Sequence, residues 1–105
     1  MTKLQAKKYQ SFTSFYPFYL SQHQDTTCRR LHFIGSSLIL VMLAYIVFHG
    51  AWILLWTLPL LGYGFAWVGH FFFEKNKPAT FTYPLYSFIG DWVMYKDIVT
   101  GKIKF

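Results

Sequence analysis

Three histidines and one carboxylate are the residues whose types and spacing point to chemistry. His70 and Glu74 are four residues apart, which on an α-helix places both side chains on one face, with Cβ atoms about 5–6 Å apart. His32 lies in an earlier apolar segment, and His23 lies on a polar stretch nine residues before it. Three imidazoles and a carboxylate suit Zn, Fe or Mn, and Fe(II) is favoured if positions are left open for oxygen.

A long uncharged stretch determines whether these side chains can meet. Residues 31–73 contain no Asp, Glu, Lys or Arg, whereas roughly 20 apolar residues are enough to cross a bilayer. The pair His49-Gly50 divides this stretch into Phe33–Phe48 and Ala51–Phe73. The pattern predicts two membrane helices joined by a tight turn, which is a hairpin that returns the chain to its starting side.

The hairpin should bring two histidines together at one membrane face. Each helix carries small side chains and a histidine at helical spacing: His32, Gly35, Ser36, Ile39 and Leu43 on the first, and Gly62, Ala66, Gly69 and His70 on the second. Small residues let the backbones of membrane helices approach closely. We therefore expect both histidines in one interface. Because ionisable residues at membrane depth are costly, they usually mark function.

Composition and charge favour a membrane protein with a single domain, residues 1–105. Hydrophobic residues make up 54% of the chain and charged residues only 13%. The net charge of +6 comes from residues that flank the apolar segments, so we expect no nucleic-acid partner. Because the turn at His49 lacks basic residues, both termini should be cytoplasmic. The membrane is then the bacterial inner membrane or, in a eukaryote, the endoplasmic reticulum.

Two further segments complete the expected fold. Tyr9–His23 is aromatic and amphipathic, which predicts an interfacial helix. Thr80–Tyr95 is a third apolar segment, too short for a simple span, and is expected to be re-entrant, interfacial or tilted. The expected class is all-α: a membrane helical hairpin with an N-terminal interfacial helix and a third apolar C-terminal helical segment.

The acidic residues and the fourth histidine allow simpler interpretations. Asp91 can be a metal ligand, a helix-end acid, or an acceptor for the N–H of a metal-bound imidazole, and we favour the last of these. Asp97 is expected to be solvated, and His49 to be a turn residue in contact with water. Each histidine of the cluster can also be an ordinary interfacial residue, and Glu74 can form a solvated ion pair with Lys75.

Three motifs in order carry a family resemblance. They are His-x8-His-x2-Gly at His23–Gly35, Gly-His-x3-Glu-Lys-x2-Pro-Ala at Gly69–Ala79, and Ser-x2-Gly-Asp-x2-Met at Ser87–Met94. From about Tyr16 to Ile103 the chain resembles the 2-hydroxy fatty acid dioxygenases, a family of small membrane proteins formerly catalogued as a domain of unknown function. Its fungal member acts in α-oxidation in the endoplasmic reticulum. The chain departs from the pattern at Asp25 and Cys28, where asparagines are expected.

The resemblance implies an Fe(II)-dependent enzyme whose histidines hold the iron. It implies that a long-chain 2-hydroxy fatty acid and O2 give the fatty acid one carbon shorter plus CO2. The expected site lies where the head group of an amphiphile in membrane lipid would lie, and a 2-hydroxy acid can chelate iron through its hydroxyl and carboxylate. Arg29 and Arg30 are placed to attract that carboxylate, although basic residues beside a membrane helix usually set topology.

Two alternatives remain open at this stage. A non-enzymatic helical-hairpin scaffold or assembly subunit would need no histidines, and the metal content of the purified protein distinguishes it from an enzyme. A lipid hydrolase with a Zn-bound water would keep the metal but change the reaction. Oxygen consumption separates that hydrolase from the dioxygenase.

Overall fold

The computed structural model describes residues 8–105, and predictions for residues 1–7 lie outside this range. All regular structure in the described range is helical. Its elements are the α-helices α2 (Phe12–Ser21), α3 (Thr26–His49), α4 (Thr57–Val68) and α5 (Pro84–Val99), the 3-10 turns η1 (Trp52–Trp56) and η3 (Ala79–Phe81), and the π-helix η2 (Gly69–Glu74). The predicted all-α class is confirmed for this part of the chain. The interfacial position of the N-terminal helix stays a prediction.

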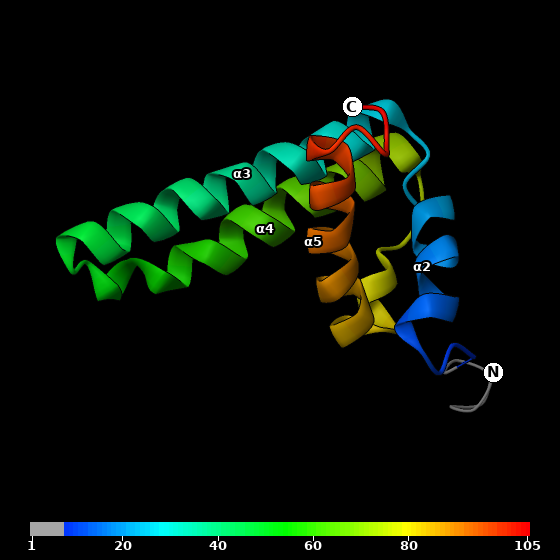
Figure 1. Ribbon diagram of the computed structural model, residues 1–105, viewed down its shortest axis with the longest axis horizontal. Coiled ribbons are helices and arrows are strands. Elements are labelled where there is room, and N and C mark those ends of the chain that lie inside the picture. Colours follow the sequence, from blue (N-terminus) through cyan, green and yellow to red (C-terminus); the bar gives the residue numbers. More distant parts are fainter. Residues whose placement is uncertain (1–7) are drawn as a thin grey trace.

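Helices α3 and α4 form an antiparallel hairpin that projects from the rest of the molecule (Figure 1). Helix α3 begins after Asp25, whose Oδ1 accepts a hydrogen bond from the Cys28 N–H at 2.9 Å, as an N-cap should. It ends at Gly50, which has a left-handed φ of 61°, a conformation that glycine adopts without a Cβ clash. The turn therefore lies where the sequence predicts it.

Two glycines allow the arms of the hairpin to approach closely. A Cβ at Gly35 would lie 2.9 Å from the Cβ of Phe65, and a Cβ at Gly69 would lie 3.1 Å from the Cα of Cys28. Real Cβ atoms essentially never approach to the distance found at Gly35, and a Cβ at Gly69 would push against the backbone of Cys28, so both positions favour glycine. The close approach brings the start of α3 beside η2, at the base of the hairpin.

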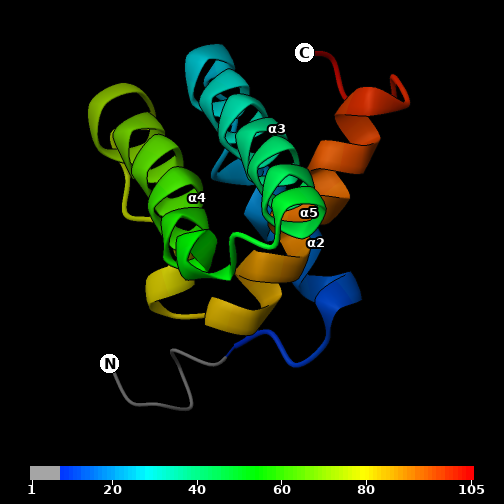
Figure 2. The ribbon, with the colours of Figure 1, turned by 90° about the vertical axis from the view of Figure 1, so that its left-hand side faces the viewer.

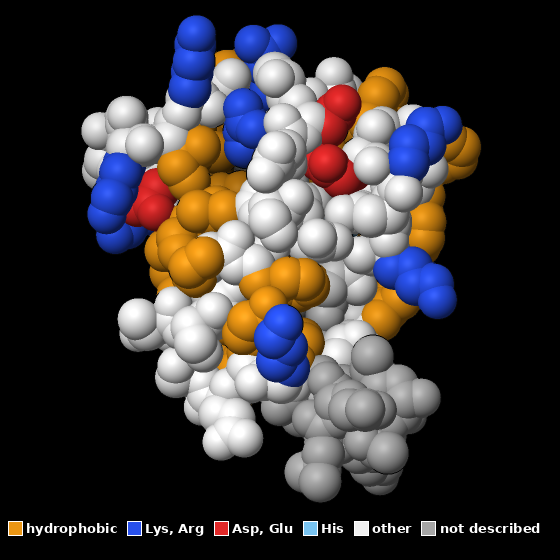
Figure 3. Space-filling view, turned by 90° about the vertical axis from the view of Figure 1, so that its right-hand side faces the viewer, with side chains coloured by type: hydrophobic (Ala, Val, Ile, Leu, Met, Phe, Trp, Pro, Cys, Tyr) orange, Lys and Arg blue, Asp and Glu red, His pale blue; other side chains and the backbone are white. Residues whose placement is uncertain are grey.

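The hairpin exposes apolar surface over most of its length. The segments Thr26–His49 and Trp52–Glu74 are long and apolar enough to cross a membrane, yet only 22% and 6% of their most apolar windows are buried. Near the turn, Phe48 is 87% and Ile53 80% exposed. Lys and Arg side chains gather instead at the end of the molecule opposite the turn (Figure 3). This distribution is compatible with insertion of the hairpin into a membrane.

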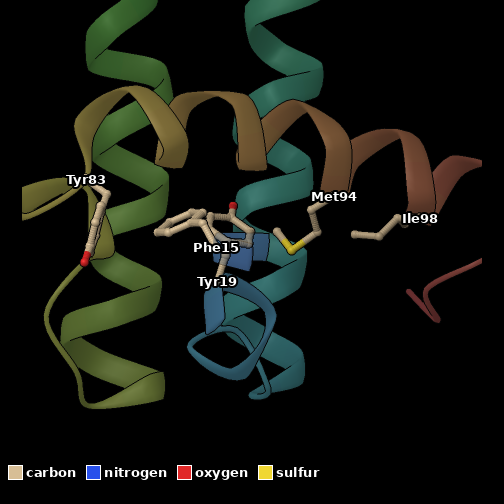
Figure 4. Packing of buried hydrophobic residues seen from close by; sticks show 5 residues of the cluster. All are labelled: Phe15, Tyr19, Tyr83, Met94 and Ile98. Carbon is tan, nitrogen blue, oxygen red and sulfur yellow. The ribbon is translucent and has the colours of Figure 1, made fainter. Parts of the chain in front are cut away.

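Helices α5 and α2 pack together across the base of the hairpin, behind α3 and α4 when the molecule is viewed from the turn (Figure 2). Their buried residues form a cluster of Phe15, Tyr19, Tyr83, Met94 and Ile98 (Figure 4). Gly90 lets α2 approach α5, because a Cβ there would lie 3.0 Å from the ring of Tyr19.

The C-terminal helix α5 begins and ends four residues later than the predicted segment Thr80–Tyr95. Pro84 is the first residue of α5, where a proline costs no hydrogen bond because the first N–H groups of a helix have no partner within it. The helix then continues to Val99, so Asp97 faces α2 and not solvent. Asp97 is 4% exposed and accepts a hydrogen bond from the Tyr16 hydroxyl at 2.8 Å. The expectation that Asp97 is solvated was wrong.

Candidate metal centre

Three of the four predicted ligands meet at the base of the hairpin. His23 follows the end of α2, His32 lies on the second turn of α3, and His70 lies in η2. Each offers one ring nitrogen, and these three atoms all lie within 4.8 Å of one another. The three residues are buried, with exposures of 2%, 7% and 2%. Such a group of imidazoles can hold a metal ion.

Backbone carbonyls fix the tautomers of two of these imidazoles. His23 Nδ1 lies 2.6 Å from the carbonyl oxygen of Tyr19, and His32 Nδ1 lies 2.9 Å from that of Cys28. A carbonyl oxygen can only accept a hydrogen bond, so each Nδ1 carries the hydrogen. Each Nε2 therefore keeps a lone pair that is free to bind an ion.

The tautomer of His70 follows from the orientation of the Asn76 side-chain amide. Asn76 donates through Nδ2 to the backbone carbonyl of Gln22 at 3.1 Å and to the side-chain Oε1 of Gln22 at 3.0 Å. Because both partners are acceptors, the amide is oriented with its Oδ1 toward His70 Nδ1, 2.7 Å away. His70 Nδ1 is consequently the donor, and its Nε2 is free as well.

The three free nitrogens make a donor set that suits a metal cation. His23 Nε2 and His32 Nε2 lie 3.2 Å apart. Because neither nitrogen carries a hydrogen, they cannot form a hydrogen bond with each other. Two ligands at about 2.0–2.1 Å from one ion are separated by about 2.9–3.4 Å for bond angles of 90–109°. Burial and the neighbouring His32 and His70 also hold the pKa of His23 well below its ordinary value. A metal ion fits this arrangement better than a proton does.

A small space adjoins the three imidazoles. Its volume is about 20 Å³, which is room for one water molecule or ion. Ser87 and Asp91 from α5 also line it. The hydroxyl of Ser87 is buried and has no hydrogen-bond partner among the described residues, so a polar atom in this space would satisfy it.

Glu74, the fourth predicted ligand, has a different partner. Its Oε1 accepts a hydrogen bond from the backbone N–H of Asp25 at 2.7 Å, and it is not part of the group of three. The spacing argument assumed an α-helix, but residues 69–74 form a π-helix, whose wider turn rotates Glu74 relative to His70. The carboxylate links the end of η2 to the loop that carries His23, and its role as a ligand stays a prediction.

Asp91 reaches the cluster through Tyr19. Its Oδ1 accepts a hydrogen bond from the Tyr19 hydroxyl, and the Tyr19 ring stacks on the ring of His23 with centroids 4.0 Å apart. Burial raises the pKa of Asp91 to about 7. Asp91 thus contacts the tyrosine that holds His23, and the expectation that it accepts a hydrogen bond from the N–H of a metal-bound imidazole stays a prediction.

Neither Arg29 nor Arg30 lines the small space beside the imidazoles. Arg29 donates through Nη1 to the backbone carbonyls of His23 at 3.1 Å and Gln24 at 3.0 Å, which fixes the loop after α2. Arg30 lies over the ring of Phe105, 4.9 Å from its centroid. Their proposed role in substrate binding stays a prediction.

His49 lies at the opposite end of α3. It is exposed, and its Nδ1 contacts the backbone carbonyl of Tyr45 at 3.1 Å. The 17 residues from His32 correspond to about 25 Å along an α-helix. His49 is therefore a natural control for every experiment on the three clustered histidines.

Sequence reasoning missed Tyr19, Gln22 and Asn76, which orient the imidazoles. Asn76 and Gln22 are separated by 54 residues, so no local pattern connects them. The only usable signal is that Asn76 lies between Glu74 and Pro78 inside a motif already assigned to the site.

Comparison with known proteins identifies a family to which the chain is similar. A family model described as "Mpo1-like: 2-hydroxy-palmitic acid dioxygenase Mpo1-like" matches residues 9–103, a range that includes every residue of the candidate centre. No curated protein and no solved structure matches the chain significantly.

Proposed function

This chain belongs to the Mpo1-like family, and we propose that it is an Fe(II)-dependent dioxygenase of long-chain 2-hydroxy fatty acids. The observation that carries the proposal is the set of three buried imidazoles, each with its Nδ1 hydrogen donated elsewhere and its Nε2 free. Iron held by three neutral nitrogen ligands keeps positions open for substrate and oxygen.

The proposed reaction balances without a further co-substrate. A 2-hydroxy fatty acid and O2 give the fatty acid one carbon shorter, CO2 and H2O. The bond between C1 and C2 breaks, and the substrate supplies all four electrons that reduce O2. When bound, Fe(II) supplies the redox chemistry that lets O2 react with the organic acid. No nicotinamide or 2-oxoglutarate is needed.

The protein residues have supporting roles in this proposal. His23, His32 and His70 bind the ion, while Tyr19 and Asn76 hold the imidazole N–H groups and so fix the ring orientations. We assign Glu74 the role of holding the loop that contains Asp25. The substrate carboxylate and hydroxyl would reach the ion beside Ser87 and Asp91, which line the small space next to the imidazoles.

A direct assay tests the function. Protein purified without metal is reconstituted anaerobically with Fe(II), and a 2-hydroxy fatty acid labelled at C1 is added with O2. The expected result is release of labelled CO2 and the one-carbon-shorter acid, with one O2 consumed for each CO2. His23→Ala, His32→Ala and His70→Ala should each abolish turnover, whereas His49→Ala should retain it.

The alternatives give different outcomes in the same assay. A protein that binds no metal and consumes no O2 would support the scaffold function. A protein that binds Zn and hydrolyses a lipid without consuming O2 would support the hydrolase. Full turnover by the three histidine variants would show that the site is misassigned.

A further inference from the structure

A larger cavity lies next to the candidate centre. Its volume is about 470 Å³, within the range of about 300–1,000 Å³ typical of ligand sites. It shares His32, Tyr63, Ala66 and Asp91 with the small space between the imidazoles. A molecule that fills this cavity would therefore have one end at the three histidines.

The residues that line the cavity change from polar to apolar along the hairpin. On α3 they are His32, Ser36, Ile39 and Leu43. On α4 they include Ala66, Gly62 and Leu58 in the antiparallel order, together with Tyr63 and Pro59. Residues three or four positions apart lie on the same side of an α-helix. The α3 residues therefore share one side of that helix, the α4 residues share one side of the other, and the two sides face each other. Phe88 and Trp92 from α5 line the same cavity. The cavity thus has a polar end and an apolar end.

Small residues on α4 leave room for the cavity. Gly62 and Ala66 occupy positions where larger side chains would fill it. A Cβ added to Gly62 would lie 3.0 Å from the Cδ1 of Ile39, so any larger side chain at this position must extend into the space between the helices. Gly64 faces elsewhere, because a Cβ added there meets nothing within 4 Å.

We propose that this cavity binds the acyl chain of the substrate, with the head group at the three histidines and the tail pointing along the hairpin toward its turn. This inference rests on the proposed function and adds where the chain lies. Ser87 supports it at the polar end, since its buried, unpaired hydroxyl can donate to a carboxylate. An amphiphile with one polar end and one unbranched apolar chain matches the order of side chains from His32 to Leu43.

The length of the cavity suggests which chains fill it. The 11 residues from His32 to Leu43 span about 16 Å, and an extended chain with carbon–carbon bonds of about 1.5 Å advances about 1.3 Å per carbon. About 12 carbons therefore fit beyond the head group. Affinity should rise with chain length up to about 14 carbons, by up to about fourfold per buried methylene (about 0.8 kcal/mol), and then level off.

Photo-crosslinking locates the chain without relying on catalysis. The probes are saturated fatty acids of about 14 carbons, which match the cavity length and lack the 2-hydroxyl, with a diazirine either near the carboxyl group or at the last carbon. The first probe should label Ser36, Ala66 or Asp91, and the second Leu43 or Leu58. If both probes label the lipid-exposed Val41 and Ile53 as strongly as these residues, the proposed location is wrong, whatever the activity assay shows.

A matched pair of variants tests the same location by specificity. Gly62→Leu places a side chain in the middle of the cavity, while Gly64→Leu makes the same change in helix propensity outside it. Gly62→Leu should lower kcat/KM for a 16-carbon 2-hydroxy acid at least tenfold relative to an 8-carbon one, and Gly64→Leu should leave this ratio unchanged. An unchanged ratio in a folded, metal-loaded Gly62→Leu protein would overturn the proposal.

Discussion

Replacing Asn76 by alanine should weaken metal binding although Asn76 is not a ligand. The substitution removes the acceptor of the His70 Nδ1 hydrogen, 2.7 Å away, and the two hydrogen bonds from Asn76 to Gln22. His70 is then free to rotate or to change tautomer. Its Nε2 would no longer be held in the direction of His23 and His32.

The magnitude follows from the lost hydrogen bond. A buried donor left without a partner costs about 1–3 kcal/mol, which at 1.4 kcal/mol per factor of ten is about 5–140-fold. This range overlaps the 10–100-fold loss of affinity typical when the partner of a metal-bound histidine is removed. We therefore expect the dissociation constant of Fe(II) to rise about 10–100-fold in Asn76→Ala.

The assay is an anaerobic Fe(II) titration against a competing chelator, with Gln22→Ala as the control. That variant removes the Gln22 Oε1 acceptor but keeps its backbone carbonyl, so Asn76 retains its orientation and affinity should change less than about threefold. Wild-type affinity in Asn76→Ala would refute the tautomer argument. An equal loss in Gln22→Ala would show that the effect comes from the packing of the loop and not from the hydrogen bond to His70.

Three further predictions concern single residues. Glu74→Gln keeps an acceptor for the Asp25 N–H and should change Fe(II) affinity less than about threefold, whereas a loss above 100-fold in the same titration would make Glu74 a ligand. Ser87→Ala should raise KM about 10–140-fold with kcat unchanged, because a hydrogen bond to a charged group contributes about 1.5–3 kcal/mol net of water, at 1.4 kcal/mol per factor of ten; an unchanged KM would exclude this contact. Burial raises the pKa of Asp91 to about 7 from about 3.9 in an unfolded chain, so the folded protein binds more protons between these values and loses stability as pH rises from about 4 to 7. The melting temperature of Asp91→Asn relative to wild type should accordingly increase between pH 5 and pH 7.5, and a constant difference would contradict the assignment.

The hairpin and the histidine cluster could be predicted from the sequence because simple physical rules determine them. An uncharged run of this length with one glycine after a histidine predicts two helices and the position of their turn. The return of the chain then places His32 and His70 at the same end, since Gly35 and Gly69 allow the helices to approach there.

The remaining features depend on contacts between distant segments. The π-helical geometry of η2 differs from the α-helix that the spacing of His70 and Glu74 assumes. Helix α5 continues past Tyr95 to Val99 and so places Asp97 against Tyr16. The polar residues around Asp97 in the sequence gave no reason to expect this contact. The amide of Asn76 acquires its orientation from Gln22, far away in the chain, so only the folded arrangement reveals the His70 tautomer.

The three histidines come from separate segments of the chain, and this affects how the protein folds together. His32 and His70 belong to the hairpin, which can form as soon as its two helices are inserted, whereas His23 arrives with the loop after α2. An ion bound by all three acts as a cross-link between these parts, and at a free concentration 100 times its dissociation constant it stabilises the docked state by about 2.7 kcal/mol. A bound ion would then stabilise the assembled protein as well as supply its chemistry: without it, the loop that carries His23 loses one link to the hairpin, while α2 stays packed against α5 through the buried cluster.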